Sequence, residues 1–132
     1  MNQIINPAPA TRRGGMGREA WVKQQNGRKA VLYVIRLYGN GEAFYKLGIT
    51  FCLSSRFSAL RFVGYKWRTV ARYSSWSAGR VFDLEAKLHS AGFVSYTPLL
   101  PFSGATECYA DCGALLAALP AKTFVLKSTI DI

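Results

Sequence analysis

The stretch that decides the fold is residues 31–50, VLYVIRLYGNGEAFYKLGIT, in which two apolar runs flank a turn sequence. Both runs are rich in β-branched and aromatic residues, a composition typical of strands. The residues GNGE between the two runs supply the asparagine and glycine that tight turns use. The stretch therefore predicts a β-hairpin with Asn40 and Gly41 at its tip.

The register of this hairpin decides which side chains share a face. A two-residue type I′ turn would place Tyr33 opposite Gly48 and put Lys46 on the same face as Tyr33. Tyr45 would then point to the other face, beside Arg36, unless a longer loop or a bulge shifts the register by one residue. Sheet parity thus favours Lys46 as the neighbour of Tyr33.

Strand and helix patterns continue downstream of the hairpin. SSRFSALRFVGY, residues 54–65, has an apolar face and predicts a short helix with Ser54 or Ser55 as its N-cap. KWRTVARYSSW, residues 66–76, alternates as a third strand, and residues 78–92, AGRVFDLEAKLHSAG, predict a helix ending at Gly92. The predicted order is β-β-α-β-α, in a small α/β (α+β) domain.

Shorter elements are expected near the C-terminus. A short strand is predicted around residues 107–109, within an irregular segment that contains two prolines. DCGALLAALP, residues 111–120, predicts a helix capped by Asp111 and stopped before Pro120, and residues 123–130 predict a terminal strand or tail.

Composition indicates one domain with a polyanionic partner. The chain has 132 residues, 50% of them hydrophobic, which is enough for one core and leaves little room for a second. Its 17 Lys and Arg residues against 7 Asp and Glu give a formal net charge of +10, which favours nucleic acid. No apolar run is long enough to span a bilayer, and the first residues resemble no signal peptide, so we expect no membrane partner and a cytoplasmic location.

Three segments are expected along the chain. Residues 1–29 combine basic residues, prolines and glycines with a single acid, Glu19, and predict a flexible basic arm with a short helix around Trp21. The arm could follow a phosphate backbone, and a passive, solvated leader is the alternative. Residues 30–110 form the main domain. Residues 111–132 add a C-terminal helix and tail that complete the same domain.

The cysteines are expected to be reduced thiols. Because their number, 3, is odd, they cannot all pair within the chain. Cys52, Cys108 and Cys112 could form a four-ligand zinc site with His89, but Cys108 and Cys112 are spaced more loosely than in the usual zinc knuckle. Small buried thiols are common without a metal, so we expect no zinc.

Arg56 stands near the start of a predicted helix, where a cation opposes the helix dipole. A bound phosphate would account for this position, because free backbone amides at the helix start and a planar guanidinium both bind phosphate oxygens. Pairing with a surface carboxylate is the alternative.

Short motifs in a fixed order resemble the GIY-YIG nuclease superfamily, and most closely a branch common in bacteriophages. That branch carries YVYVI, YKIG-x-T, an arginine, E-x-x-LH and E-aromatic-aromatic. This chain carries LYVIR, YKLGIT, SSRF, LEAKLH and TECY, between about Val31 and Tyr109. Each motif alone is weak, whereas their order and spacing together are fairly specific.

The resemblance implies a fold, an activity and a set of site residues. The fold is a central three-stranded antiparallel sheet flanked by helices, and the activity is cleavage of phosphodiester bonds with one divalent ion, Mg²⁺ or Mn²⁺. By this likeness Tyr33 takes the role of the first motif's tyrosine, Arg56 that of the phosphate-binding arginine and Glu85 that of the metal-holding carboxylate.

Two departures from the founding GIY-YIG pattern bear on the site. Lys46 stands where that pattern has a tyrosine, and Tyr45 stands one place earlier, as in the phage branch, so both are candidates. The late asparagine of the founding pattern is absent, and Glu107 of TECY occupies that region, as a second metal-holding acid or as a structural hydrogen-bond acceptor.

Hydrolysis of a phosphodiester explains why these residue types are needed. A tyrosine among positive charges can act as a base or position water, although core packing alone would also explain Tyr33. Glu85 can hold Mg²⁺, which takes one or two carboxylates and keeps several waters, although Glu85 could also be only a solvated helix residue. His89 lies four residues beyond Glu85 on the same helix face and could orient water, relay a proton or contact phosphate; a partner for the helix dipole is the alternative.

Other residues are expected to contact nucleic acid. Gly48, opposite Tyr33, leaves a gap in the sheet surface that a sugar-phosphate strand could approach, although packing could also explain it. Trp67, Tyr73 and Trp76 interleave with cations and could stack on bases or belong to the core. The basic residues expected to follow the phosphate backbone are Arg12, Arg13, Arg18, Arg61, Lys66, Arg68 and Arg72.

The leading hypothesis is a metal-dependent DNA endonuclease encoded by a phage or mobile element. RNA is not excluded as the partner, and a homodimer is one arrangement that could read two half-sites. The alternative is a nucleic-acid-binding module that keeps the fold without cutting. A third hypothesis is an inhibitor or host-takeover factor that docks on an acidic protein.

Overall fold

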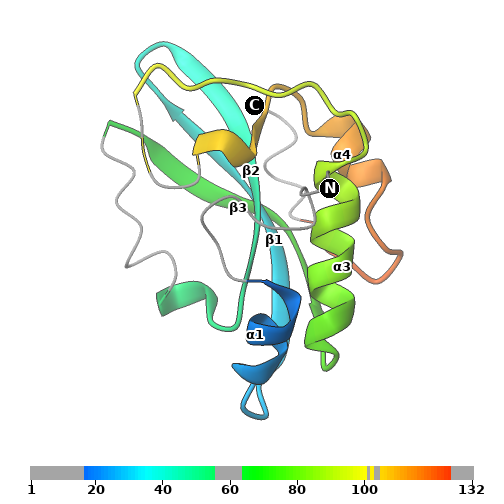
Figure 1. Ribbon diagram of the computed structural model, residues 1–132. Helices are drawn as coiled ribbons and strands as arrows, with labels where there is room; N and C mark the ends of the chain where they lie inside the picture. The colour runs from blue at the N-terminus through cyan, green and yellow to red at the C-terminus, as the bar shows by residue number, and fades with distance from the viewer. Residues whose placement is uncertain (1–16, 56–63, 101, 103–104, 126–132) are drawn as a thin grey trace, which may run out of the picture.

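The computed structural model describes residues 17–55, 64–100, 102 and 105–125 of the chain. It has a mixed α+β architecture in which helices flank a β-sheet (Figure 1). In chain order the named elements are α1 Arg18–Lys23, β1 Ala30–Gly39, β2 Glu42–Thr50, β3 Lys66–Ser75, α3 Ala78–His89, the 3₁₀-helix η2 Ala105–Glu107, β4 Cys108–Tyr109, α4 Gly113–Ala117 and β5 Phe124–Val125.

The sheet is antiparallel and has five strands in the order β4-β2-β1-β3-β5. The three strands expected from the sequence form its centre, with β1 between β2 and β3. The expectation of a three-stranded sheet is corrected by β4 and β5, two residues each, which pair with the outer edges of β2 and β3. Strands were predicted at both places, around residues 107–109 and within 123–130, and both are confirmed, although residues 126–130 lie outside the described residues. Their pairing with the central strands was not predicted, because two-residue strands carry no readable alternation.

The hairpin of β1 and β2 has the predicted register. Asn40 and Gly41 at its tip have φ angles of 55° and 77°, which are the left-handed conformations of a type I′ turn. Tyr33 pairs with Gly48, and the pairing places Lys46 on the face of the sheet that carries Tyr33. Local turn chemistry and the two-residue period of a strand are thus enough to set this register.

One face of the sheet packs against α3, which runs alongside it with α1 at its lower end (Figure 1). The core on this face joins Leu32, Val34, Leu47, Ile49 and Val70 of the sheet to Val81, Phe82 and Leu88 of α3. This apolar layer holds α3, and with it any functional side chain that α3 carries, in a fixed place beside β2.

The helix predicted around Trp21 is confirmed, and it belongs to the folded core. Trp21 is 5% exposed, stacks on Phe51 with ring centroids 4.0 Å apart, and donates a hydrogen bond from Nε1 to the backbone oxygen of Ala78 at 2.9 Å. The expected flexible arm therefore includes a helix fixed against α3. Residues 1–16 lie outside the described part of the chain.

Several helix ends differ from those expected. Helical conformation begins at Leu53, so neither Ser54 nor Ser55 is the N-cap, and residues 56–63 of the predicted helix lie outside the described residues. α3 ends at His89 instead of Gly92. α4 begins at Gly113, although Asp111 does accept a hydrogen bond from the Gly113 N–H at 3.0 Å. Among the described helices, none is both long enough and apolar enough to cross a bilayer.

The other face of the sheet is covered in part by the segment between α3 and η2, which runs across the top of the view toward the hairpin tip (Figure 1). Phe44 of β2 stacks on Tyr96 of this segment with ring centroids 4.9 Å apart. Glu42 accepts hydrogen bonds from the hydroxyls of Tyr65 and Tyr96 and from the backbone N–H of Leu99. One carboxylate thus ties the segment to the first residue of β2.

Candidate active site

Tyr33 lies within β1, and its ring covers Gly48 of β2. A Cβ atom added at Gly48 would lie 2.4 Å from the hydroxyl oxygen of Tyr33 and 2.6 Å from its Cζ. The space above the glycine is therefore filled by the tyrosine, which corrects the expectation of a gap open to a sugar-phosphate strand. Glycine is required here because the tyrosine ring packs directly on the backbone.

Lys46 connects this tyrosine to an acid. Its Nζ donates to the Tyr33 hydroxyl at 3.3 Å and to Oε1 of Glu107 at 3.2 Å. Burial by itself lowers the pKa of the Lys46 ammonium, but the neighbouring Tyr33 and Glu107 outweigh burial and hold this pKa above its ordinary value. Lys46 therefore stays charged although its side chain is 0% exposed.

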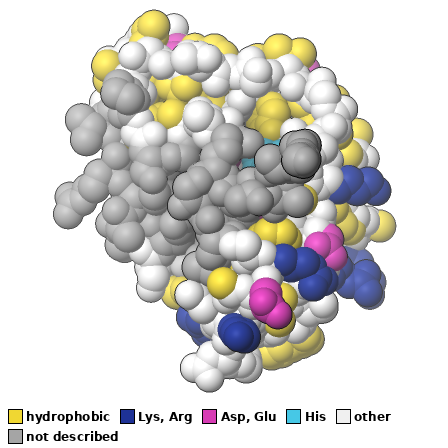
Figure 2. All heavy atoms as spheres, viewed as in Figure 1, with side chains coloured by type: hydrophobic (Ala, Val, Ile, Leu, Met, Phe, Trp, Pro, Cys, Tyr) yellow, Lys and Arg dark blue, Asp and Glu magenta, His cyan; other side chains and the backbone are white. Residues whose placement is uncertain are grey.

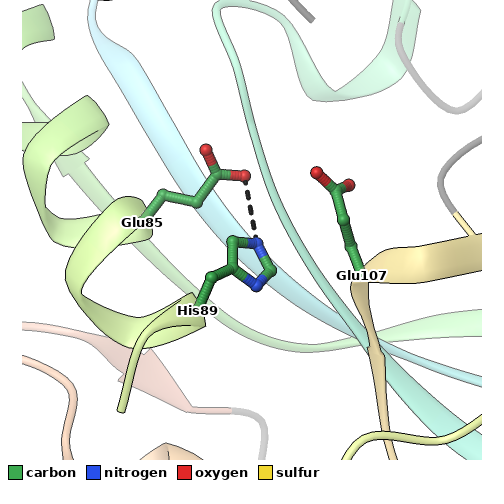
Figure 3. Close-up of side chains that lie close together, drawn as sticks. All are labelled: Glu85, His89 and Glu107. Atoms are coloured by element: carbon green, nitrogen blue, oxygen red, sulfur yellow. Dashed lines mark ion pairs between the residues drawn. The ribbon is translucent and has the colours of Figure 1, made fainter. Parts of the chain in front are cut away.

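Glu85 and His89 of α3 approach Glu107 from the neighbouring helix. The two α3 residues lie one turn apart, with Nε2 of His89 3.5 Å from Oε2 of Glu85. Figure 3 shows these side chains and that of Glu107, at the end of η2, extending toward a common space. One ligand atom of each residue lies within 4.8 Å of the other two. We call Glu85, His89 and Glu107 the acidic-histidine cluster.

The acidic-histidine cluster is chemically suited to a divalent cation. Both carboxylates are buried, with Glu85 1% and Glu107 6% exposed. Carboxylate oxygens are the ligands that Mg²⁺ and Mn²⁺ prefer, and an imidazole nitrogen is acceptable to Mn²⁺ and to later transition metals. The residue types and their proximity therefore fit the metal that the sequence resemblance implies, with Glu85 and Glu107 as the expected ligands.

One expected catalytic residue, Tyr45, is not part of this arrangement. Tyr45 pairs with Arg36 and packs against the core on the α3 face of the sheet, away from Tyr33. Of the two candidates that the sequence left open, Lys46 is therefore the one that the structure brings to Tyr33. Arg56 lies outside the described residues.

A β-bulge divides the basic residues of β3 between the two faces of the sheet. The β1–β3 register shifts between Val34 and Ile35, and this shift places Arg72 opposite Tyr33, on the same face as the tyrosine. Lys66 and Arg68 lie on the opposite face. The three basic candidates on β3 therefore do not share one face, because a strand bulge reverses the alternation beyond it.

The remaining basic candidates contribute little to one patch. Arg18 of α1 is exposed but forms an ion pair with Asp83 of α3, with 2.8 Å between Nε and Oδ1. Figure 2 shows Lys and Arg side chains gathered over the lower and right parts of the view, around α1 and α3, with acidic side chains among them. Arg12, Arg13 and Arg61 lie outside the described residues.

Sequence reasoning missed Tyr109 as a site residue. Its hydroxyl forms a hydrogen bond with Nδ1 of His89, and the two rings lie nearly parallel with centroids 5.7 Å apart. The signal was present, since Tyr109 is the last residue of the quoted TECY motif. The strand β4 places it by pairing Tyr109 with Tyr45.

The cysteines occupy different environments. Burial raises the pKa of Cys108 to about 12, so its thiol stays protonated. Cys52 is exposed, and hydrogen bonds with Ser55 and Ser54 lower its pKa to about 7. Within the described residues, the group arranged to hold a metal contains His89 but none of the three cysteines.

Comparison of the chain with protein-family models, curated proteins and solved structures gave no match.

Proposed function

We propose that the chain is a metal-dependent endonuclease of the GIY-YIG type that hydrolyses phosphodiester bonds in DNA. The observation that carries this proposal is a connected buried cluster: Lys46 bridges Tyr33 and Glu107, and Glu107 faces Glu85 and His89. These residues come from motifs that are well separated in the sequence. Their convergence is what a shared reaction centre requires.

Tyr33 is the proposed proton acceptor. Hydrolysis needs a group that takes a proton from water, and positive charge that stabilises the transition state. The ammonium of Lys46, 3.3 Å from the Tyr33 oxygen, stabilises negative charge on that oxygen. In the proposed step the water oxygen bonds to phosphorus and its proton passes to the deprotonated Tyr33 oxygen. The bond from phosphorus to the leaving oxygen breaks, its electron pair stays on that oxygen, and the oxygen takes a proton from solvent.

Other residues hold and orient the reacting groups. Glu85 and Glu107 would hold Mg²⁺ or Mn²⁺, which when bound supplies positive charge to the phosphate oxygens. Lys46 fixes the position of Glu107 through their ion pair. Arg72 is exposed on the face that carries Tyr33, which supports a proposed contact with the DNA backbone. The SSRF motif assigns Arg56 to the scissile phosphate.

Burial of the cluster supports a second candidate function. Tyr33 and Lys46 are both 0% exposed, so a scissile phosphate reaches them only if the chain that covers them moves. A nucleic-acid-binding module that keeps the fold without cutting needs no such movement. The two functions differ in whether bound DNA is cleaved.

Plasmid nicking tests the proposal. The purified chain is incubated with supercoiled plasmid and Mg²⁺ or Mn²⁺, beside Glu85→Gln, Tyr33→Phe and Arg56→Ala. We expect wild type to nick the plasmid and each variant to be slower by about 100-fold or more. Tyr33→Phe keeps the ring over Gly48 and removes the hydroxyl. Glu19→Gln, which changes an exposed acid of α1, is the control and should nick like wild type.

The same experiment separates the alternatives. DNA binding without nicking by the wild-type chain would favour the non-catalytic module. Absence of binding even at low salt would favour a protein that docks on an acidic protein partner. A matched RNA substrate run in parallel shows which nucleic acid is preferred.

A further inference from the structure

The position of His89 indicates a role beyond sharing a helix face with Glu85. Its Nε2 is buried in the acidic-histidine cluster, within 3.5 Å of Oε2 of Glu85, and makes no hydrogen bond to any residue that the structure describes. Buried polar nitrogens normally have a hydrogen-bond partner. An atom placed in this way is suited to donate its lone pair to a metal ion.

The other ring nitrogen of His89 is already engaged. Nδ1 is hydrogen-bonded to the hydroxyl of Tyr109, which also stacks against the imidazole. Metal-binding histidines typically make such a bond through the nitrogen that does not ligate, because it sets the tautomer and the orientation of the ring. When Nδ1 carries the ring proton, it donates a hydrogen bond to the Tyr109 hydroxyl. The lone pair of Nε2 then faces Glu85 and Glu107.

We propose that His89 is a third metal ligand through Nε2, oriented by Tyr109, and that the cluster therefore binds Mn²⁺ more tightly than Mg²⁺. This inference rests on the metal site proposed at Glu85 and Glu107. Two carboxylates alone suit Mg²⁺, which binds oxygen and keeps its waters. An added imidazole shifts the preference toward first-row transition metals. The competing arrangement is an Nε2–H of His89 directed at Glu85, with no metal.

Pulsed electron paramagnetic resonance of bound Mn²⁺ tests direct ligation without any mutation. His89 is the single histidine of the chain, so a tag-free protein offers one imidazole. We expect the spin-echo envelope of the wild-type complex with Mn²⁺ to show nitrogen modulation, and the Glu85→Gln control to lose most Mn²⁺ binding. A wild-type spectrum without nitrogen modulation would overturn the proposal.

Titration with Mn²⁺ or Mg²⁺ alone, in the absence of DNA, measures the preference. We expect His89→Gln to raise the Kd for Mn²⁺ about tenfold or more and to leave the Kd for Mg²⁺ nearly unchanged. Tyr109→Phe should weaken Mn²⁺ binding in the same direction, because the ring loses its orienting hydrogen bond. Asp83→Asn, an exposed acid on the same helix, should change neither Kd. Equal Mn²⁺ affinity in wild type and His89→Gln would refute ligation.

The metal measurements and the nicking assay test the two proposals separately, so one proposal can be refuted while the other stands. If Mn²⁺ binding depends on His89 but no plasmid is nicked, the three-ligand site stands and the nuclease proposal does not. If plasmid is nicked with Mg²⁺ while His89→Gln binds Mn²⁺ as tightly as wild type, the nuclease stands and the third ligand does not. If circular dichroism shows that His89→Gln does not fold, the nitrogen modulation of the wild-type Mn²⁺ complex and the Kd of Tyr109→Phe for Mn²⁺ test whether His89 is a ligand.

Discussion

At the residue scale, Lys46 shows how one buried charge depends on its neighbours. An isolated ammonium in a protein interior would be strongly destabilising, and here Glu107 at 3.2 Å and the Tyr33 hydroxyl at 3.3 Å compensate it. Breaking such a buried pair by removing one partner generally costs more than the pair contributes. Lys46 therefore joins Tyr33 to Glu107, and in the proposed mechanism it is the charge beside the Tyr33 oxygen.

At Gly48, packing leaves no room for a side chain. Gly48→Ala should destabilise the fold by about 1–3 kcal/mol, because the new Cβ collides with a buried tyrosine ring that must move. The displaced ring should also lose its contact with Lys46. Chemical denaturation measures the change in the free energy of unfolding.

Gly113→Ala is the matched control for this substitution. A Cβ at Gly113, the first residue of α4, meets its nearest neighbour, Asp111 Oδ1, at an ordinary 3.6 Å, so the control should be neutral or slightly stabilising. Equal stability of Gly48→Ala and wild type would contradict the packing of Tyr33 on Gly48.

At the element scale, Glu42 fastens the segment after α3 to the hairpin. Burial acts to raise the pKa of Glu42, but hydrogen bonds from Tyr65, Tyr96 and Leu99 outweigh it and hold this pKa below its ordinary value of 4.5. Since the folded state has the lower pKa, the carboxylate's contribution to stability is complete above about pH 4.5. It is lost as the pH falls through the folded-state pKa.

Glu42→Gln should therefore lower Tm by several degrees at pH 7, and the difference from wild type should shrink below about pH 4.5. Thermal unfolding followed by circular dichroism between pH 7 and acidic conditions measures both effects. A difference in Tm that stays constant as the pH falls would show that the substitution acts through packing instead of charge. Glu19→Gln, at an exposed position, serves as the control.

At the scale of the whole molecule, the net charge of +10 dominates the expected interaction with nucleic acid. The described basic side chains are nevertheless unequal. Arg72 is exposed and lies on the face of Tyr33, whereas Arg18 is exposed but paired with Asp83. A cation that already has an acidic partner neutralises phosphate less effectively.

Salt dependence of DNA binding should separate these two arginines. Arg72→Gln should reduce the slope of log K against log salt concentration by about 0.9, as for one lost phosphate contact. Arg18→Gln should change this slope less, because its ion pair with Asp83 must be broken before it can bind phosphate. Fluorescence anisotropy with a short DNA duplex gives both slopes. An Arg72→Gln slope equal to that of wild type would place Arg72 outside the interface.

The sequence by itself determined the central hairpin, its register and the pairing of Lys46 with the Tyr33 face. These features depend on neighbouring residues: a type I′ turn and the two-residue period of a strand are local properties. The pattern also indicated the third strand and the helix that carries Glu85 and His89. Local patterns and motif order were thus enough to propose Glu85 and Glu107 as metal ligands.

Only the tertiary structure decided how those residues meet. The ion pair of Lys46 with Glu107, the contact of His89 with Tyr109 and the bulge that turns Arg72 toward Tyr33 all join segments that are distant in the chain. So do the pairings of β4 with β2 and of β5 with β3, and the sequence predicted these short strands but not the strands they would pair with. Contacts between distant segments depend on how whole elements pack, and a pattern read along one segment carries no information about that packing.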